Sequence, residues 1–158
     1  MTESDLLIIG TGAAGSSCAL RAADLGLNVT LVTGSREVSK GSNTSWAQGG
    51  IIFRGKDDSP ESLARDIHEA GHGICFDPAV RLTAERGPKV VEELLIERCG
   101  VEFDRGPGGE WDFTEEGAHS LPRIIHVEDA TGRAIAQGLS AEVAKHPNIT
   151  LLKGGTAV

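Results

Sequence analysis

Three glycines near the N-terminus have the spacing of a dinucleotide-binding turn. Gly10, Gly12 and Gly15 follow the pattern G-x-G-x-x-G within the stretch IIGTGAAGSSCA. In such a turn the first glycine bends the chain, the second lets the backbone approach a pyrophosphate, and the third lets a helix pack closely on a strand. The phosphates then lie at the helix N-terminus, where free N–H groups and the helix dipole attract anions. The alternative is a purely structural glycine turn, but the pattern follows an apolar run and opens a helix, which favours nucleotide binding.

A second stretch, SNTSWAQGG at residues 42–50, combines small polar side chains with two adjacent glycines. It offers many hydrogen-bond donors and little side-chain bulk. This combination suits a flat cofactor that lies against the backbone. The alternative is a polar surface loop.

The end of the predicted second strand lacks an expected acid. In dinucleotide-binding folds an aspartate or glutamate there usually binds the ribose hydroxyls. This chain has Thr33 at that position, and Glu37 lies too far along to replace the acid. A threonine hydroxyl can bind the ribose, but more weakly than a carboxylate does. The missing acid weakens the case for NAD as the nucleotide.

A competing motif is HEAGH, residues 68–72, which satisfies the zinc-peptidase pattern H-E-x-x-H. In that case His68 and His72 would bind zinc and Glu69 would act as the general base. Both histidines must then lie on one helix, but glycines flank the second, and a helix that starts at Ser59 is ending there. The sequence therefore favours two exposed histidines near a helix terminus.

The elements that position the glycine turn form a strand–helix–strand unit. Residues 5–9 are a short apolar run that predicts a buried strand. Residues 13–26 are predicted to be a helix with Gly26 at its C-terminal end, and residues 28–33 alternate as a second strand. A unit of this length makes a parallel sheet. The predicted fold class is therefore α/β, a Rossmann-like nucleotide-binding domain.

The rest of the chain carries further start and stop signals. Residues 34–58 have no clear period, whereas Ser59–Pro60 and Asp77–Pro78 are helix start signals. We expect Gly87–Pro88 to interrupt the second of these helices. The later elements are predicted to be a helix over 89–100, a hairpin over 101–120, a helix over 130–147 and a strand over 148–153. Because only about three parallel strands precede Val158, we expect the domain to be incomplete in this chain.

Composition and charge exclude several classes of protein. The 158 residues suffice for one domain, and the net charge of −8 comes without a lysine or arginine cluster that would bind nucleic acid. No apolar run approaches the roughly 18 residues that span a membrane. Three cysteines without CxxC spacing indicate reduced thiols in a cytoplasmic protein. The isolated residues are predicted to be structural: Cys18, Cys75, Cys99 and Trp111 in packing, and His126 and His146 as hydrogen-bonded polar groups.

Four stretches in order, IIGTGAAG, NTSWAQGGI, EEGAHS and EDATGR, give the chain a more specific likeness. With them it resembles the L-aspartate oxidases, a branch of the flavoprotein family of succinate dehydrogenase and fumarate reductase. Residues 1–158 then correspond to the N-terminal part of an FAD-binding domain, without the capping and C-terminal helical domains. The resemblance implies FAD, with its adenine half on the strand–helix–strand unit and its isoalloxazine near AQGG. The implied cofactor-binding residues are Gly10, Thr11, Gly12, Ala13, Ala14 and Gly15 in the turn, Thr33, and Asn43, Thr44, Ser45, Trp46, Ala47, Gln48, Gly49 and Gly50, which we call the flavin loop.

Asn43 bears on how the cofactor is attached. In the succinate dehydrogenase branch the corresponding loop carries a histidine that is bonded covalently to FAD. An amide is not nucleophilic enough to form that bond, so Asn43 can only donate or accept hydrogen bonds. The resemblance therefore implies noncovalent FAD.

The stretch TEEGAHS resembles the part of the family that approaches the dicarboxylate substrate. Glu116 corresponds to a glutamate that faces the amino group of the substrate, and a carboxylate there favours aspartate over succinate or fumarate. His119 and Ser120 are expected to line the same cleft. The alternative for Glu116 is a solvated hairpin residue. EDATGR is expected to position backbone near the cofactor, although Thr131 can equally be a helix N-cap.

The implied activity is FAD-dependent oxidation of L-aspartate to iminoaspartate, with oxygen or fumarate as electron acceptor. This is the first step of NAD biosynthesis through quinolinate, which makes quinolinate synthase a possible partner. In this family the catalytic residues come from later sequence, so the resemblance implies that residues 1–158 alone are inactive. The alternatives are a fumarate reductase or succinate dehydrogenase flavoprotein subunit and, more remotely, a zinc peptidase.

Overall fold

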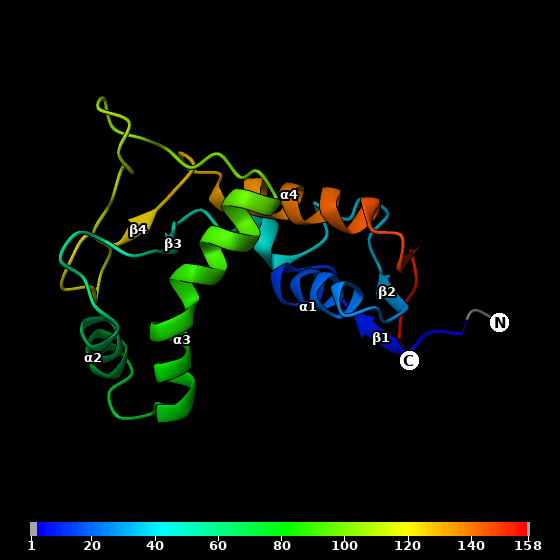
Figure 1. Cartoon of the computed structure of the whole chain (residues 1–158), viewed down its shortest axis with the longest axis horizontal. Coiled ribbons are helices and arrows are strands. Elements are labelled where there is room, and N and C mark those ends of the chain that lie inside the picture. The colour runs from blue at the N-terminus through cyan, green and yellow to red at the C-terminus, as the bar shows by residue number, and fades with distance from the viewer. Residues whose placement is uncertain (1–2, 158) are drawn as a thin grey trace.

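The computed structural model describes residues 3–157, and its N-terminal elements form the expected unit (Figure 1). Strand β1 (Leu6–Ile9) leads through helix α1 (Ala13–Asp24) to strand β2 (Val29–Thr33). β1 and β2 pair in parallel, and strand β5 (Ile149–Lys153) pairs in parallel with the other edge of β2. The sheet order is therefore β1-β2-β5. The predicted α/β fold with a parallel sheet is confirmed.

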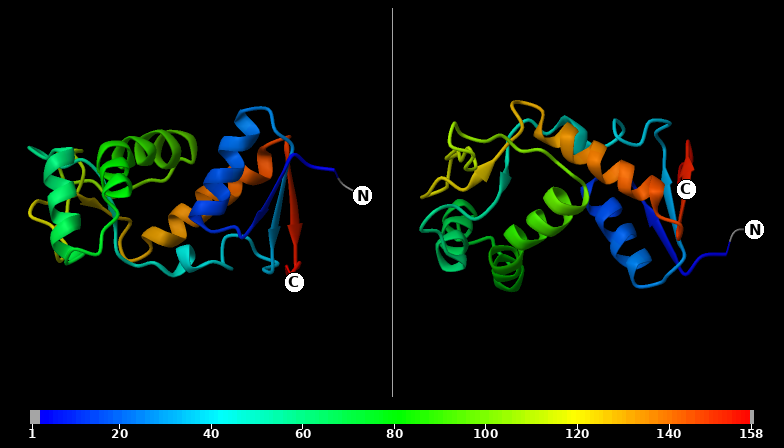
Figure 2. Two further views of the ribbon diagram at one scale, coloured as in Figure 1. Left: turned by 90° about the horizontal axis from the view of Figure 1, so that it is seen from below. Right: turned by 45° about the horizontal axis from the view of Figure 1, so that its top comes forward.

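One face of this sheet carries the helices. Helices α1 and α4 (Thr131–Lys145) lie side by side on it, and both views of Figure 2 show them on the same side of the strands. Leu20 of α1, Leu31 of β2 and Leu139 of α4 are almost fully buried between the layers. Each such side chain stabilises the fold by about 1.5–3 kcal/mol through apolar burial. This layer holds the N-termini of both helices near the C-terminal edge of the sheet.

The opposite face of β1 is open. Leu7 is 59% exposed and Ile9 is 65% exposed, whereas Leu6 and Ile8 pack against the core. The predicted strand is present, but the prediction that it is buried is wrong. The reason is that parallel strands are buried on both faces only where helices cover both, and here helices cover one.

The elements between residues 51 and 125 form the other half of the structure, away from this sheet. It contains β3 (Ile51–Ile52), α2 (Pro60–Ala70), α3 (Asp77–Val90), the wider π-helical turn η2 (Val91–Arg98) and β4 (Ile124–Ile125), which pairs antiparallel with β3. Figure 1 shows α2 and the β3–β4 pair at the end of the molecule opposite the parallel sheet. A short 3₁₀ helix, η1 (Asn43–Trp46), lies in the connection between the two halves.

Helix α2 starts as the sequence predicts. The Ser59 hydroxyl accepts a hydrogen bond from Ser62 N at 3.1 Å, and Pro60 occupies the first helical position. The cap satisfies one of the free N–H groups of the first turn, and proline lacks the donor that this position cannot use.

Helix α3 does not break where the sequence predicts a break. It continues through Gly87 and Pro88 and passes directly into η2. A proline inside a helix leaves the carbonyl four residues earlier without its donor. Arg54 Nη2 takes that place by donating to Ala84 O at 2.9 Å. A side chain from outside the helix therefore replaces the missing hydrogen bond, and the expected interruption at Gly87–Pro88 is wrong.

The predicted hairpin over 101–120 is reduced to a turn with one antiparallel bridge. Arg105 pairs with Trp111, and Gly106 N donates to Glu110 O at 2.8 Å. The indole packs edge-on against Phe53 with ring centroids 5.8 Å apart, and the Arg105 guanidinium lies 3.5 Å from its centroid. The packing role of Trp111 is confirmed.

The cysteines are free, but Cys18 is not a packing residue. It is exposed beside a cavity of about 610 Å³ between α1 and the α3–η2 helix, because the two do not close over that side of α1. Cys75 and Cys99 are partly buried. His126 and His146 each have one hydrogen-bonded ring nitrogen, as expected. No helix over residues 3–157 is both long and apolar enough to cross a lipid bilayer.

Candidate cofactor and substrate site

The glycine turn has the geometry that its spacing predicts. Gly10 adopts φ +104°, a conformation that favours glycine, and its N–H donates to Val32 O at 2.8 Å. A Cβ at Gly15 would lie 2.0 Å from the Gly10 carbonyl oxygen. Only glycine therefore lets α1 pack this closely against the end of β1. The turn brings the predicted residues 10–15 around the N-terminus of α1, and their binding of a diphosphate stays a prediction.

The flavin loop is joined to this turn by a threonine. Thr44 Oγ1 accepts a hydrogen bond from Ala13 N at 3.0 Å, and a Cβ at Gly12 would lie 3.3 Å from the same oxygen. The first turn of α1 contains no acidic residue, and its N-cap is a glycine without a side chain. The positive end of the helix dipole is therefore not neutralised by a carboxylate of its own first turn, which suits a phosphate group.

Thr33 is placed differently from the expectation for a ribose ligand. It is only 6% exposed. Its Oγ1 accepts hydrogen bonds from Thr11 Oγ1 and Ser35 N, each at 3.2 Å. The Thr33 hydroxyl therefore holds the glycine turn to the end of β2, and a role in holding Thr11 fits the structure better than a direct contact to ribose.

The flavin loop packs on the first turn of α4. Gly132 N donates to Ala47 O at 3.0 Å, and a Cβ at Gly132 would lie 2.0 Å from Thr44 O. Thr131, which precedes it, is not the N-cap of α4, because Ala130 occupies that position. The Thr131 hydroxyl instead accepts from Val127 N at 2.9 Å, so the N-cap prediction is wrong. This segment does place backbone against the flavin loop, and its expected position near the cofactor stays a prediction.

The tandem glycines meet the predicted substrate segment. Gly50 N donates to Glu116 Oε1 at 3.1 Å, although 66 residues separate the two. A Cβ at Gly50 would lie 2.1 Å from Ile124 Cγ2 of β4, so only glycine fits there. Glu116 is otherwise exposed. The structure thus brings one predicted substrate-binding carboxylate to the end of the flavin loop.

A cavity of about 470 Å³ lies between α1, the flavin loop, η2 and α4. Its walls combine small residues of the predicted site with apolar side chains of the helices. The predicted residues that line it are Ala13, Ala14, Thr44, Ala47, Gly49 and Gly50. A largely apolar, glycine-lined cavity fits a planar ring that lies against backbone. Asn43, Trp46 and Gln48 belong to the loop but do not line this cavity, and all three are exposed.

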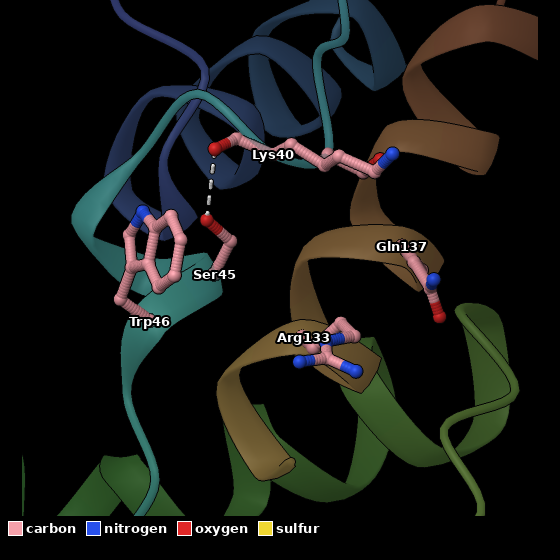
Figure 3. A pocket seen from close by; sticks show the side chains of 6 residues that line it. Lys40, Ser45, Trp46, Arg133 and Gln137 are labelled. Atoms are coloured by element: carbon pink, nitrogen blue, oxygen red, sulfur yellow. Dashed lines mark hydrogen bonds between the residues drawn. The ribbon is translucent and has the colours of Figure 1, made fainter.

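A second cavity, of about 370 Å³, lies on the other side of the flavin loop (Figure 3). Lys40, just before the flavin loop, and Arg133 of α4 line it, and Gln137 follows one turn later on the same helix. Ser45 Oγ donates to Lys40 O at 3.2 Å and to Ser42 O at 2.6 Å, which fixes this part of the loop. Two cations near the positive end of α4 can attract an anionic group of a cofactor. Sequence reasoning gave neither cation a role, although Arg133 ends the quoted stretch EDATGR.

His119 and Ser120 are held by a buried ionic cluster. Ser120 donates through both N and Oγ to Asp66 Oδ2, each at 2.8 Å, and Arg123 Nη1 donates to the same oxygen at 2.5 Å. Arg123 is fully buried and also binds Asp58. Burial opposes ionisation of Asp66, but the hydrogen bonds from Ser120 and Arg123 outweigh it and lower the pKa of Asp66 to about 2.

Sequence reasoning missed this cluster. In the sequence, Asp58, Asp66 and Arg123 resemble ordinary surface charges, because burial of a charge depends on neighbours from distant segments. The sequence does place Arg123 between the predicted substrate segment and the apolar pair Ile124–Ile125, and this position next to apolar residues was the available signal for a buried arginine.

The zinc-peptidase alternative does not fit the structure. Helix α2 ends at Ala70, and His72 lies beyond it with φ +46°, so the two histidines do not share a helix face. His68 Nε2 lies 3.6 Å from Asp77 Oδ1. Within the described part of the chain no three His, Cys, Asp or Glu residues come together as metal ligands.

Comparison with known proteins agrees with this fold. Residues 5–157 match the family described as FAD binding domain. The chain belongs to that family. This membership confirms the expected FAD-binding fold, and FAD is the cofactor that it implies.

The similar sequences are L-aspartate oxidases. The chain is 41% identical to that of Vibrio cholerae over 163 residues, covering 99% of this chain and 29% of the relative. It is 38% identical to that of Halobacterium salinarum over 157 residues, covering 99% and 30%. The chain thus spans about 30% of the length of these relatives, and the resemblance stated above is confirmed.

The similar solved structures belong to the wider flavoprotein family. The Sdh1 complex of Mycobacterium smegmatis in its apo form superimposes with a TM-score of 0.88 at 28% identity, covering 96% of this chain and 27% of that one. Quinol fumarate reductase of E. coli superimposes with a TM-score of 0.87 at 24% identity, which supports the fold alone.

Proposed function

We propose that this chain is the nucleotide-binding part of an FAD-dependent oxidase that converts L-aspartate to iminoaspartate, the first step of NAD biosynthesis through quinolinate. The contact between Gly50 N and Glu116 Oε1 carries the proposal, because it brings a carboxylate from the substrate segment to the flavin loop. The similarity to L-aspartate oxidases supports the same reaction. The proposed electron acceptor is oxygen or fumarate. The proposed location is the cytoplasm, where quinolinate synthase would use the product.

The proposed division of labour follows from the site. FAD, when bound, supplies the redox chemistry. The N-terminus of α1 and the turn at residues 10–15 would hold its diphosphate, and Gly49 and Gly50 would leave room for its ring. Glu116 uses Oε1 for Gly50, which leaves Oε2 to pair with the ammonium group of L-aspartate. Succinate and fumarate have no ammonium, so they leave this carboxylate unpaired.

Noncovalent attachment of FAD is part of the proposal. Asn43 is the first residue of η1 and directly precedes Thr44. Its amide cannot replace the histidine that bonds FAD in the succinate dehydrogenase branch. Flavin that stays on the polypeptide after denaturation would instead favour the alternative function, a succinate dehydrogenase or fumarate reductase subunit.

A chimera tests the proposal directly. The 158 residues replace the corresponding segment of the Vibrio cholerae L-aspartate oxidase, to which they align over almost their whole length. We expect that acid denaturation releases FAD from the chimera. In the absence of oxygen, L-aspartate should bleach the flavin and succinate should not. Glu116→Gln should raise KM for L-aspartate by about tenfold or more, because it removes the charge that pairs the ammonium. Equal bleaching by succinate and L-aspartate would overturn the proposal.

We also propose that the 158-residue chain alone is inactive. The resemblance assigns the catalytic residues of such oxidases to sequence that follows the segment aligned here. Turnover of L-aspartate by the purified chain with added FAD would contradict this statement.

A further inference from the structure

The Arg123 guanidinium uses all five of its N–H donors inside the protein. Nε and Nη2 bind the two oxygens of Asp58 at 3.0 Å each, and Nη2 also donates to Ser62 Oγ at 3.0 Å. Nη1 donates to Asp66 Oδ2 at 2.5 Å and contacts His119 Nδ1 at 3.0 Å. Arg123 is fully buried. A buried cation with every donor matched to an acceptor is held in one orientation.

This orientation decides which nitrogen of His119 carries the proton. An arginine side chain stays protonated and can only donate, so His119 Nδ1 must accept. In the neutral ring the proton is then on Nε2. His119 Nε2 makes no hydrogen bond with any residue in the described range 3–157. His119 therefore offers an N–H donor on the edge of the ring away from Arg123.

The same cluster fixes the backbone around His119. Ser120 is anchored twice to Asp66, and His119 N donates to Glu116 O at 3.1 Å. Ala118, inside this turn, adopts φ +71°, which disfavours any residue with a Cβ. A strained turn persists where surrounding contacts determine it. Glu116 and His119 are thus the two ends of one rigid turn.

We propose that Arg123 is a positioning residue that holds His119 as the Nε2–H tautomer, so that Glu116 and His119 present an acceptor and a neutral donor from one turn to an amino acid substrate. The acceptor takes the ammonium and the donor takes a carboxylate oxygen. This inference rests on the proposed function for the identity of the ligand. The tautomer itself depends only on the chain and is measured without any ligand.

The first test is ¹⁵N NMR of the histidine rings in the full chain, with His119→Gln to assign the signal. We expect a bare, pyridine-type Nδ1 and a protonated, pyrrole-type Nε2 for His119. His126 is the internal control, because its Nδ1 faces Asp104 Oδ2 at 3.0 Å and must donate there. The neutral His126 ring should therefore show the opposite tautomer. A protonated Nδ1 at His119, or the averaged pattern of free histidine, would overturn the proposal.

Variants separate positioning from general stability. Arg123→Lys has no fork of donors for His119 and should give a mixture of tautomers. Ser62→Ala removes one acceptor of Arg123 that touches neither His119 nor the carboxylates, and it should leave the tautomer unchanged. If Arg123→Lys does not fold, the spectrum of the unaltered chain still decides. A retained single tautomer in a folded Arg123→Lys chain would contradict the positioning role.

The second test uses the chimera described above. His119→Gln keeps an N–H donor near the position of Nε2, whereas His119→Leu has none. We expect His119→Leu to raise KM for L-aspartate by about tenfold or more and His119→Gln by much less. Equal effects would overturn the donor role. If the tautomer is as expected but the chimera does not oxidise L-aspartate, the proposed function fails and the positioning by Arg123 stands.

Discussion

Replacing Gly132 with alanine tests whether the flavin loop is held by backbone contact with α4. The added Cβ would lie 2.0 Å from Thr44 O and 2.7 Å from Ala47 O. To reach even 3.0 Å, the Thr44 oxygen must move by about 1 Å. The clash involves backbone on both sides, so no side-chain rotation can relieve it.

The expected change in the free energy of unfolding follows from two destabilising effects and one stabilising effect. Overpacking of this kind costs about 1–3 kcal/mol. Displacing the loop also breaks the hydrogen bond from Gly132 N to Ala47 O, worth about 1 kcal/mol. Alanine gains up to about 1 kcal/mol over glycine as a helix former. We therefore expect Gly132→Ala to lower the free energy of unfolding by about 2 kcal/mol.

Gly87→Ala is the matched control. Gly87 also lies in a helix, but apart from its chain neighbours the nearest atom to an added Cβ is Thr83 Cγ2 at 3.9 Å, an ordinary contact. Because Gly87 precedes Pro88, whose ring disfavours a Cβ on the preceding residue in the helical conformation, the gain in helix propensity is offset and the free energy of unfolding should change by less than about 1 kcal/mol. Urea unfolding of the full chain measures both values. If Gly132→Ala is as stable as Gly87→Ala, the loop is not held as described and the reasoning is refuted.

Three further predictions concern side chains of the same region. The pKa of Asp66 is lowered from 3.8 to about 2, so its ionised form stabilises the fold by about 2 kcal/mol above pH 4. This contribution is lost as the pH falls from 4 to 2. Asp66→Asn should therefore lose that acid dependence of the free energy of unfolding, and equal pH profiles for the two proteins would contradict it. Ala118→Gly should raise the free energy of unfolding by about 0.5 kcal/mol by relieving a positive φ, and a loss of stability would show that the turn is not strained. Burial raises the pKa of Cys99 to about 11, so at pH 8 a thiol reagent should label exposed Cys18 well before Cys99; equal rates would refute the burial of Cys99.

Much of the fold follows from local rules that the sequence states directly. The glycine spacing at residues 10–15, the serine cap at Ser59 and the alternation of residues 28–33 each depend on neighbours along the chain. Their energies come from φ, capping and periodicity, which a short segment determines by itself. These predictions match the structure for that reason.

The errors arise where distant segments meet. Arg54 supplies the hydrogen bond that Pro88 cannot, so a predicted break became a continuous helix. The face of β1 is open because helices cover only one side of the sheet. None of these partners is visible in the local sequence.

The candidate site divides in the same way. The sequence alone predicted the nucleotide-binding turn from its glycine spacing, the flavin loop from its small polar residues, and the substrate segment from the resemblance to L-aspartate oxidases. Only the tertiary structure decided that Glu116 meets Gly50 and that Arg123 is buried against Asp58 and Asp66. The physical reason is that hydrogen bonding and burial of a charge depend on atoms from elements more than fifty residues apart, which the order of residues does not specify.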